Sequence, residues 1–201
     1  MAYHHGQLHR AMIDAALELV REGGPKGLTL RAAARRAGVS VAAPYRHFAD
    51  KEALLAAVAL EGFTELVARL EKIASEIDEP VERLKRLGIA YVRFATDDPA
   101  RYRVMFGDEI PDRKAHPELE EMARRSFGYL AKAVADGHAR GLLEGGERAV
   151  TLLSWSVVHG LASLLLDGQA RVPTDAKSVD AIGDQLGTLL LVGVVKRPRG
   201  A

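Results

Sequence analysis

The sequence predicts an all-α fold in which a small N-terminal three-helix domain precedes a larger C-terminal helical bundle. Apolar residues recur at spacings of three and four along nearly every periodic segment, which is the pattern of amphipathic helices. Glycine, proline and capping residues interrupt this pattern where helices would end, and the C-terminal part gives no strand signal. A chain of 201 residues with 48% hydrophobic residues is long and apolar enough to bury a substantial core.

The net charge of +1 is unevenly distributed along the chain. Residues 1–60 hold eight Lys or Arg against five Asp or Glu, whereas residues 61–201 hold twenty against twenty-two. This asymmetry suggests an anion-facing N-terminal module joined to a neutral body. Cysteine is absent, the start lacks the apolar run of a signal peptide, and the interrupted apolar stretch 152–166 is too short to span a bilayer. We therefore expect a cytoplasmic protein that does not contact a membrane.

The first two helices are expected before residue 38. The apolar spacing of residues 8–20 predicts an amphipathic helix, which Gly23–Pro25 ends. Thr29 is placed to cap a short second helix, whose alanines face inward and whose arginines face outward.

Two further helices complete the N-terminal domain. Gly38 permits a tight turn, and Ser40 is expected to cap a third helix that runs to about Phe48. Asp50 caps a long fourth helix, whose apolar stripe continues to Ile77 and so leaves the first domain.

The segment of about residues 28–48 has the spacing of a helix-turn-helix motif, with a glycine-containing turn between two short helices. Its alanines let the helices cross closely, so that their outer surfaces can carry hydrogen-bond donors to a DNA backbone. An ordinary helical hairpin with a solvated basic face has the same spacing. The spacing alone therefore leaves both interpretations open.

The residues themselves carry a more specific signal. The stretch "TLRAAARRAGVSVAAPYRHFADKEALL" places A-G-V-S after one helix, Y-x-H-F at the end of the next, and D-K-E-x-L at the start of a third. It resembles the N-terminal DNA-binding domain of the TetR family of bacterial transcriptional repressors, and the resemblance extends back to about residue 5. This resemblance implies that residues 41–46 face the major groove and that four side chains contact phosphates, namely Thr29, Tyr45, His47 and Lys51.

With the outward-facing Arg31 and the expected cap Ser40, the set of residues predicted to contact DNA is Thr29, Arg31, Ser40, Val41, Ala42, Ala43, Tyr45, Arg46, His47 and Lys51. Many relatives have Lys, Gly and Thr where this chain has Val41, Ala42 and Ala43. The side chains of residues 41–44 in this chain cannot donate a hydrogen bond. Direct base recognition is therefore expected from Arg46 and from apolar contact with thymine methyl groups. Pro44 is expected to tighten the start of the helix.

The second domain is predicted to begin near residue 75 and to contain only helices. Pro80, Asp98–Pro99 and Pro117 each mark a helix start, and residues 107–115 form a polar loop. The last two helices, about 147–168 and 175–196, are apolar on more than one face and so need cover on several sides. In the family that the first domain resembles, the last two helices pair with their twins, which implies a homodimer and a palindromic operator.

The motif "WSVVHG" places Trp155 and His159 on one helical face. It is similar to the C-terminal domain of a TetR subgroup with a Trp-x-x-x-His-Gly pattern. One interpretation is that the indole fills the core and the imidazole is hydrogen-bonded inside it. The other is that both line an effector pocket, whose predicted residues are Tyr91, Phe94, Met105, Phe106, Phe127, Trp155 and His159. Such a pocket would suit a small hydrophobic molecule.

An enzyme and a pure interaction protein are the rival classes. His159 and Asp167 are eight residues apart with no nucleophile between them on that face, and neither a phosphate-binding loop nor a nucleotide fingerprint is present. The histidine and glutamates of residues 116–121 share only their composition with a metal site. An interaction protein with a dimerising body would need no operator.

The sequence therefore predicts a TetR-type helix-turn-helix domain over residues 5–65 and a ligand-binding and dimerisation domain over residues 75–197. The expected function is that of a homodimeric repressor, which a small hydrophobic effector releases from double-stranded operator DNA. We expect neither enzymatic activity, nor a cofactor, nor a metal site.

Overall fold

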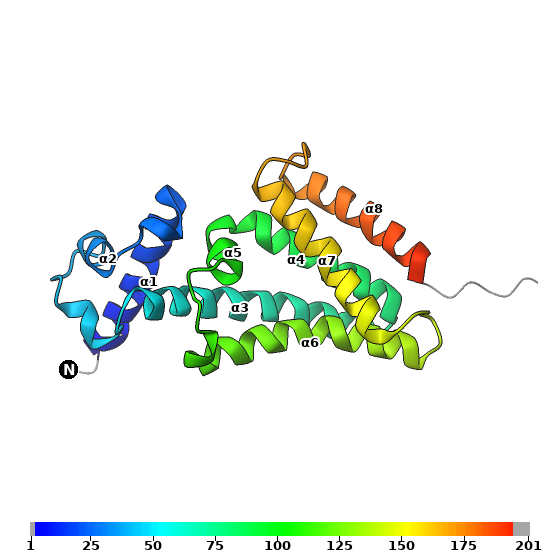
Figure 1. The fold of residues 1–201 in the computed structure, drawn as a ribbon, viewed down its shortest axis with the longest axis horizontal. Coiled ribbons are helices and arrows are strands. Elements are labelled where there is room, and N and C mark those ends of the chain that lie inside the picture. Colours follow the sequence, from blue (N-terminus) through cyan, green and yellow to red (C-terminus); the bar gives the residue numbers. More distant parts are fainter. Residues whose placement is uncertain (1–2, 195–201) are drawn as a thin grey trace, which may run out of the picture. The chain divides into compact units, whose positions relative to one another are not determined.

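The computed structural model describes the backbone of residues 3–194 and the side chains of residues 7–194. The α-helices over this range are α1 (Tyr3–Gly23), α2 (Leu30–Arg36), α3 (Lys51–Glu76), α4 (Pro80–Asp97), α5 (Pro99–Phe106), α6 (Pro117–Ala139), α7 (Glu147–Leu166) and α8 (Ala176–Val194) (Figure 1). Three short 3-10 helices lie between them, at Pro25–Gly27, Ala43–Arg46 and Arg113–Ala115. The predicted all-α fold class is confirmed.

The chain divides into two compact units, and the residues in each unit differ from the expected domain ranges 5–65 and 75–197. The first unit contains the residues up to Glu65 together with Asp98–Ala123, and the second contains Leu66–Asp97 together with the residues from Arg124 onward. Helix α5 therefore belongs with the N-terminal residues, although the sequence places it inside the range 75–197. A Cβ added at Gly62 of α3 would lie 2.4 Å from the Sδ atom of Met105, so only glycine lets α5 lie this close to α3.

The first unit is held together by a core of small and medium side chains. Met12 and Ala16 of α1, Ala33 and Ala34 of α2, and Leu54 of α3 are fully buried. Local chemistry sets the helix ends as predicted, because Thr29 Oγ1 accepts from Ala32 N at 3.1 Å and Asp50 Oδ1 accepts from Ala53 N at 2.8 Å. At the end of α2, Gly38 has a φ of 69°, which is a left-handed conformation that favours glycine.

The third helix is not the α-helix expected from Ser40 to about Phe48. It is a single 3-10 turn over Ala43–Arg46, and the Ser40 side chain does not cap it. Pro44 explains the difference, since it lacks the N–H that an α-helix would bond to the carbonyl of Ser40 and restricts the residue before it. Instead the amide of Ala43 donates to that carbonyl at 3.0 Å, an i to i−3 bond. The segment expected to face DNA is therefore shorter and tighter than an ordinary recognition helix.

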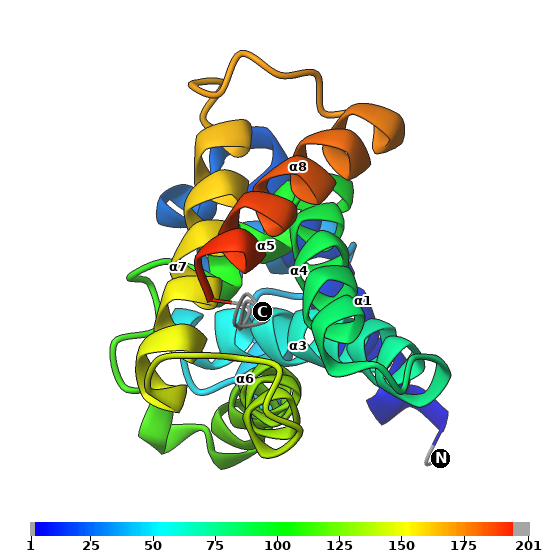
Figure 2. The ribbon, with the colours of Figure 1, turned by 90° about the vertical axis from the view of Figure 1, so that its right-hand side faces the viewer.

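In the second unit, α4 packs against both α7 and α8, and Figures 1 and 2 both show these helices side by side. Two glycines lie at the contacts. A Cβ at Gly88 would lie 3.0 Å from Val158, and a Cβ at Gly183 would lie 3.2 Å from Ile89. The predicted helix starts at Pro80, Pro99 and Pro117 are those of α4, α5 and α6.

Helix α7 begins five residues before the apolar stretch 152–166. Residues 147–166 form one helix, which by length and composition alone is long and apolar enough to cross a membrane, so the expectation that it is too short was wrong. One such helix is weak support for a membrane span, because a packed helix of a soluble protein passes the same test. Here α7 packs against α4 and α8.

Candidate nucleic-acid interface and ligand site

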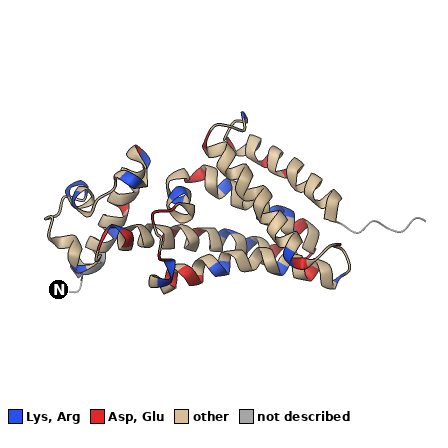
Figure 3. Ribbon diagram, viewed as in Figure 1, with Lys and Arg blue, Asp and Glu red and all other residues tan. Residues whose placement is uncertain are grey.

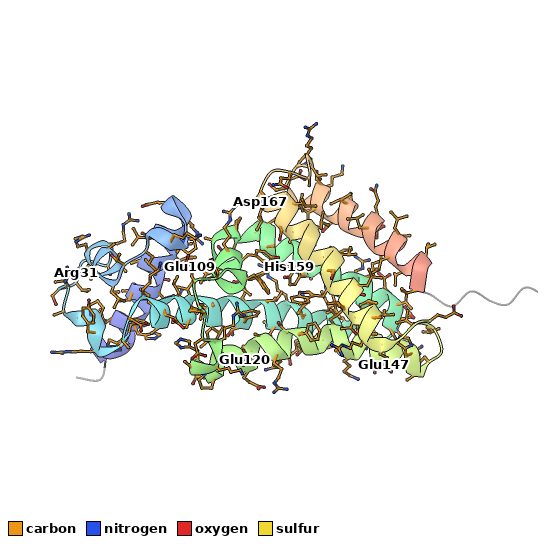
Figure 4. The ribbon with its side chains drawn as sticks, in the orientation of Figure 1. Arg31, Glu109, Glu120, Glu147, His159 and Asp167 are labelled. Carbon is orange, nitrogen blue, oxygen red and sulfur yellow. The ribbon has the colours of Figure 1, made fainter. Side chains whose placement is uncertain are left out.

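All ten residues predicted to contact DNA lie in the first unit, from Thr29, which caps α2, to Lys51, the first residue of α3. Most of their side chains are exposed, including two large apolar ones, Val41 at 48% and Tyr45 at 54%. The other exposed members are Thr29, Arg31, Ser40, Ala42 and Arg46, and the half-buried members are Ala43, His47 and Lys51. Figure 4 labels Arg31, on α2. Because large apolar side chains are usually buried, this surface is suited to contact another molecule.

Arg31 and Arg35 of α2 are exposed, whereas Arg36 makes ion pairs within the first unit. Its guanidinium binds Glu22 through two nitrogens, at 2.8 and 2.7 Å, and Glu18 at 3.2 Å. These hydrogen bonds raise the pKa of Arg36 and lower the pKa of Glu22. Arg36 therefore ties α2 to α1.

Lys51 has protein partners that the sequence did not predict. Its Nζ atom donates to the backbone oxygen of Lys26 at 3.1 Å and to Oε2 of Glu109 at 3.0 Å. Glu109 lies on the segment between α5 and α6 and is labelled in Figure 4. The sequence gives no local signal for this pair, since 58 residues separate its members.

A second unpredicted cluster surrounds Arg101 of α5. Its guanidinium lies 3.2 Å from Glu65, 3.3 Å from Glu61 and 3.2 Å from Asp98. Arg10 of α1 binds Glu61 as well, at 3.0 Å. Of these contacts only the Asp98–Arg101 pair, three residues apart, has a spacing that could have been recognised in the sequence.

In the second unit, four of the seven predicted pocket residues form a continuous cluster from α4, α6 and α7. The hydroxyl of Tyr91 lies 2.8 Å from Nδ1 of His159, and the Trp155 and His159 ring centroids lie 5.6 Å apart, as their spacing on one helical face predicts. Phe127 meets the Trp155 indole edge-on at 5.8 Å. Burial lowers the pKa of His159 below its ordinary value, which favours the neutral form of the imidazole.

The other three predicted pocket residues make different contacts within their own units. Phe94 is fully buried in the second unit, beneath the guanidinium of Arg69 at 5.4 Å. Met105 and Phe106 belong to the first unit, where the Phe106 ring lies 5.4 Å from Phe63. The pocket and the alternative core role of Trp155 and His159 both stay predictions.

Helices α7 and α8 carry large apolar side chains that are exposed among residues 7–194. The exposed ones are Leu152, Leu153, Leu164, Leu189 and Val192. Figure 3 shows few charged positions along α8 and the later part of α7. Within residues 7–194, no three His, Asp or Glu side chains gather in an arrangement that could hold a metal ion.

Two family models match the chain. Residues 12–58 match the model described as bacterial regulatory proteins, tetR family. Residues 84–186, more than half of the chain, match the model described as tetracyclin repressor-like, C-terminal domain.

Individual proteins show the same similarity. The HTH-type transcriptional regulator Rv1816 of Mycobacterium tuberculosis is 26% identical over 195 residues, which cover 81% of this chain and 82% of that protein. A solved structure of a protein with unknown function from Rhodococcus sp. RHA1 is 31% identical, with a TM-score of 0.81 and coverage of 96% and 98%. The transcriptional regulator FadR of Bacillus subtilis, solved in complex with stearoyl-CoA, shares the fold at 19% identity and a TM-score of 0.75, with coverage of 92% and 98%.

Proposed function

The chain belongs to the TetR family of bacterial transcriptional regulators. We propose that it is a repressor that binds a palindromic operator as a homodimer. We further propose that a small hydrophobic effector releases it from that operator. As a member of this family it is a DNA-binding regulator and not an enzyme. The observation that carries the proposal is the exposed surface of residues 29–46, which combines Arg31 and Arg46 with the apolar Val41 and Tyr45.

In the proposed complex, the phosphate contacts position the protein and a few side chains recognise bases. The Thr29 hydroxyl accepts a hydrogen bond from Ala32 N and keeps its own hydrogen, which can donate to a phosphate oxygen. Arg46 presents a planar fork of donors that matches the N7 and O6 atoms of guanine. Val41 offers methyl groups to a thymine methyl. Because the recognition segment is a single 3-10 turn, few bases can be read directly, so DNA shape supplies the remaining specificity.

The homodimer is supported by the exposed apolar residues of α7 and α8. Five large apolar side chains on two neighbouring helices would lie in water in a monomer. A two-fold contact would bury the same patch on both copies. It would also fix the distance between the two recognition segments, which must match two half-sites on one face of the duplex.

The effector is proposed to bind at the cluster of Tyr91, Phe127, Trp155 and His159. The cluster offers aromatic surface and one neutral imidazole, so it would favour an uncharged or weakly polar lipophilic group. FadR, which shares this fold, was solved in complex with stearoyl-CoA, and this supports a lipophilic effector for the present chain. A ligand shifts the DNA-binding equilibrium only through different affinities for the bound and released arrangements.

Protection of a bound duplex from cleavage tests the operator proposal. The expected pattern is two protected patches related by two-fold symmetry, about one helical turn or a small multiple of it apart. One protected patch would contradict a dimeric operator complex.

Trp155 supplies the test of the effector site, because it is the single tryptophan of the chain. We expect long-chain acyl-CoA probes that change its fluorescence to weaken duplex binding in the same concentration range. The Tyr91→Phe variant should shift both titrations together, since it removes the hydroxyl bonded to His159. Release of DNA without a fluorescence change would place the effector elsewhere.

A further inference from the structure

We propose that Glu109 competes with DNA phosphate for Lys51 and thereby sets how tightly the protein binds DNA. The proposal rests on the proposed function, since it concerns a lysine expected to contact the DNA backbone. Glu109 lies on the connection between α5 and α6, within residues 84–186 that match the C-terminal family model.

The Lys51 ammonium is already engaged in the DNA-free protein. Two of its three donors are directed at protein atoms, the carbonyl oxygen of Lys26 at 3.1 Å and the Glu109 carboxylate at 3.0 Å. The Glu109 side chain is 14% exposed and the Lys51 side chain 33%. A pair that is partly shielded from water interacts more strongly than a surface pair.

The residues next to Glu109 in sequence make several contacts within the first unit. Ile110, the next residue, is 3% exposed. Arg113 donates to the backbone oxygen of Met105, and its guanidinium lies 5.9 Å from the centre of the Phe63 ring. His116 Nε2 lies 3.6 Å from Glu52, the residue that follows Lys51. Because these contacts hold both sides of Glu109, pairing with Lys51 costs little additional conformational entropy.

A phosphate bound to Lys51 would meet the negative charge of Glu109 on the same ammonium. Two anions that share one cation repel each other, and the protein interior around them screens this repulsion less than water would. The repulsion opposes DNA binding at every sequence, because the phosphate backbone is the same everywhere. Glu109 thus lowers the affinity for all duplexes and leaves base recognition to other residues.

A double-mutant cycle tests the proposal with the full chain. Glu109→Gln, Lys51→Ala, the double variant and the wild type are titrated against a labelled duplex of arbitrary sequence and roughly 30 base pairs, at several salt concentrations. We expect Glu109→Gln to bind about tenfold more tightly at low salt. Its salt dependence should be steeper by up to about 0.9 in the log–log slope, which corresponds to one more phosphate contact. In the Lys51→Ala background the same substitution should gain nothing.

Asp108→Asn is the matched control, because it removes the same charge from the neighbouring residue, whose side chain is exposed. An equal gain in affinity from Asp108→Asn would mean that net charge alone is responsible and would overturn the proposal. Unchanged or weaker binding by Glu109→Gln, with an unchanged melting temperature, would also overturn it and would make Glu109 a residue that positions Lys51. If none of the variants nor the wild type binds the duplex at low salt, the proposed function itself fails.

Discussion

Replacing Leu189 with glutamate is expected to dissociate the homodimer. Leu189 is 68% exposed, which is the largest exposed fraction among the large apolar side chains of residues 7–194. Full burial of a leucine contributes about 2 kcal/mol, so covering this fraction contributes about 1.4 kcal/mol in each copy. Two-fold symmetry counts the contact twice, which gives about 2.7 kcal/mol, or about 100-fold in the dimer dissociation constant. Burying a carboxylate at the same place adds to this loss.

Sedimentation equilibrium over a range of protein concentrations measures the dissociation constant directly. Val41→Glu is the matched control, because it places the same charge on another exposed apolar position, at 48% exposure, in the helix-turn-helix segment. We expect Val41→Glu to remain dimeric and to lose DNA affinity, and Leu189→Glu to become monomeric. A Leu189→Glu variant that is as dimeric as the wild type would show that α8 does not form the interface.

The remaining predictions concern base recognition, helix packing and the pH dependence of stability. Arg46→Ala should cost about 1–3 kcal/mol of operator binding and relax the preference at one base pair, which binding to single-base operator variants would reveal. Gly62→Ala should destabilise the fold by up to about 2 kcal/mol in urea unfolding, because overpacking against the buried Met105 outweighs the gain in helix propensity. Gly128→Ala should instead stabilise by up to about 1 kcal/mol, since nothing lies within 4 Å of its added Cβ. The lowered pKa of His159 means that the unfolded chain takes up a proton below pH 6.5 that the folded chain does not, so stability should fall as pH falls through 6.5. In the His159→Gln variant, the free energy of unfolding should fall less over this pH range than in the wild type. If the two proteins had the same pH profile, His159 would not be the group responsible for the fall.

Local chemistry was sufficient to predict where most helices begin. Thr29 and Asp50 accept hydrogen bonds from the first turn of the helices that they were expected to cap. Asp98 does the same for Arg101 N, and Pro99 follows it as the first residue of α5. Each signal acts within about four residues, so it can be recognised without knowing the tertiary structure.

The recognition segment shows how one residue can outweigh a local pattern. Ser40 has the identity and position of a helix cap, but its side chain makes no capping hydrogen bond. Pro44 removes the amide that the first α-helical hydrogen bond would need, and the chain forms a 3-10 turn instead. The sequence indicated a tighter start at Pro44 but not the loss of the whole α-helix.

Contacts between distant segments account for the features that the sequence did not predict. Lys51 and Glu109 are 58 residues apart, and the closeness of Gly62 to Met105 depends on α5 folding with the N-terminal residues. Met105 and Phe106 belong to the first unit and the Tyr91–His159 cluster belongs to the second, although all four residues were part of one predicted pocket. The apolar pattern of a helix predicts which residues are buried, but it does not predict which other helix covers them.

We propose above all that this chain binds specific DNA sequences as a dimer. The most direct test is to let the purified protein select duplexes from a random pool. The enriched sequences should contain two inverted half-sites, and the affinity for the enriched duplex should fall steeply with rising salt. A folded, dimeric protein that enriches no sequence at low salt, in the absence of any effector, would contradict the claim and favour an interaction protein that needs no operator.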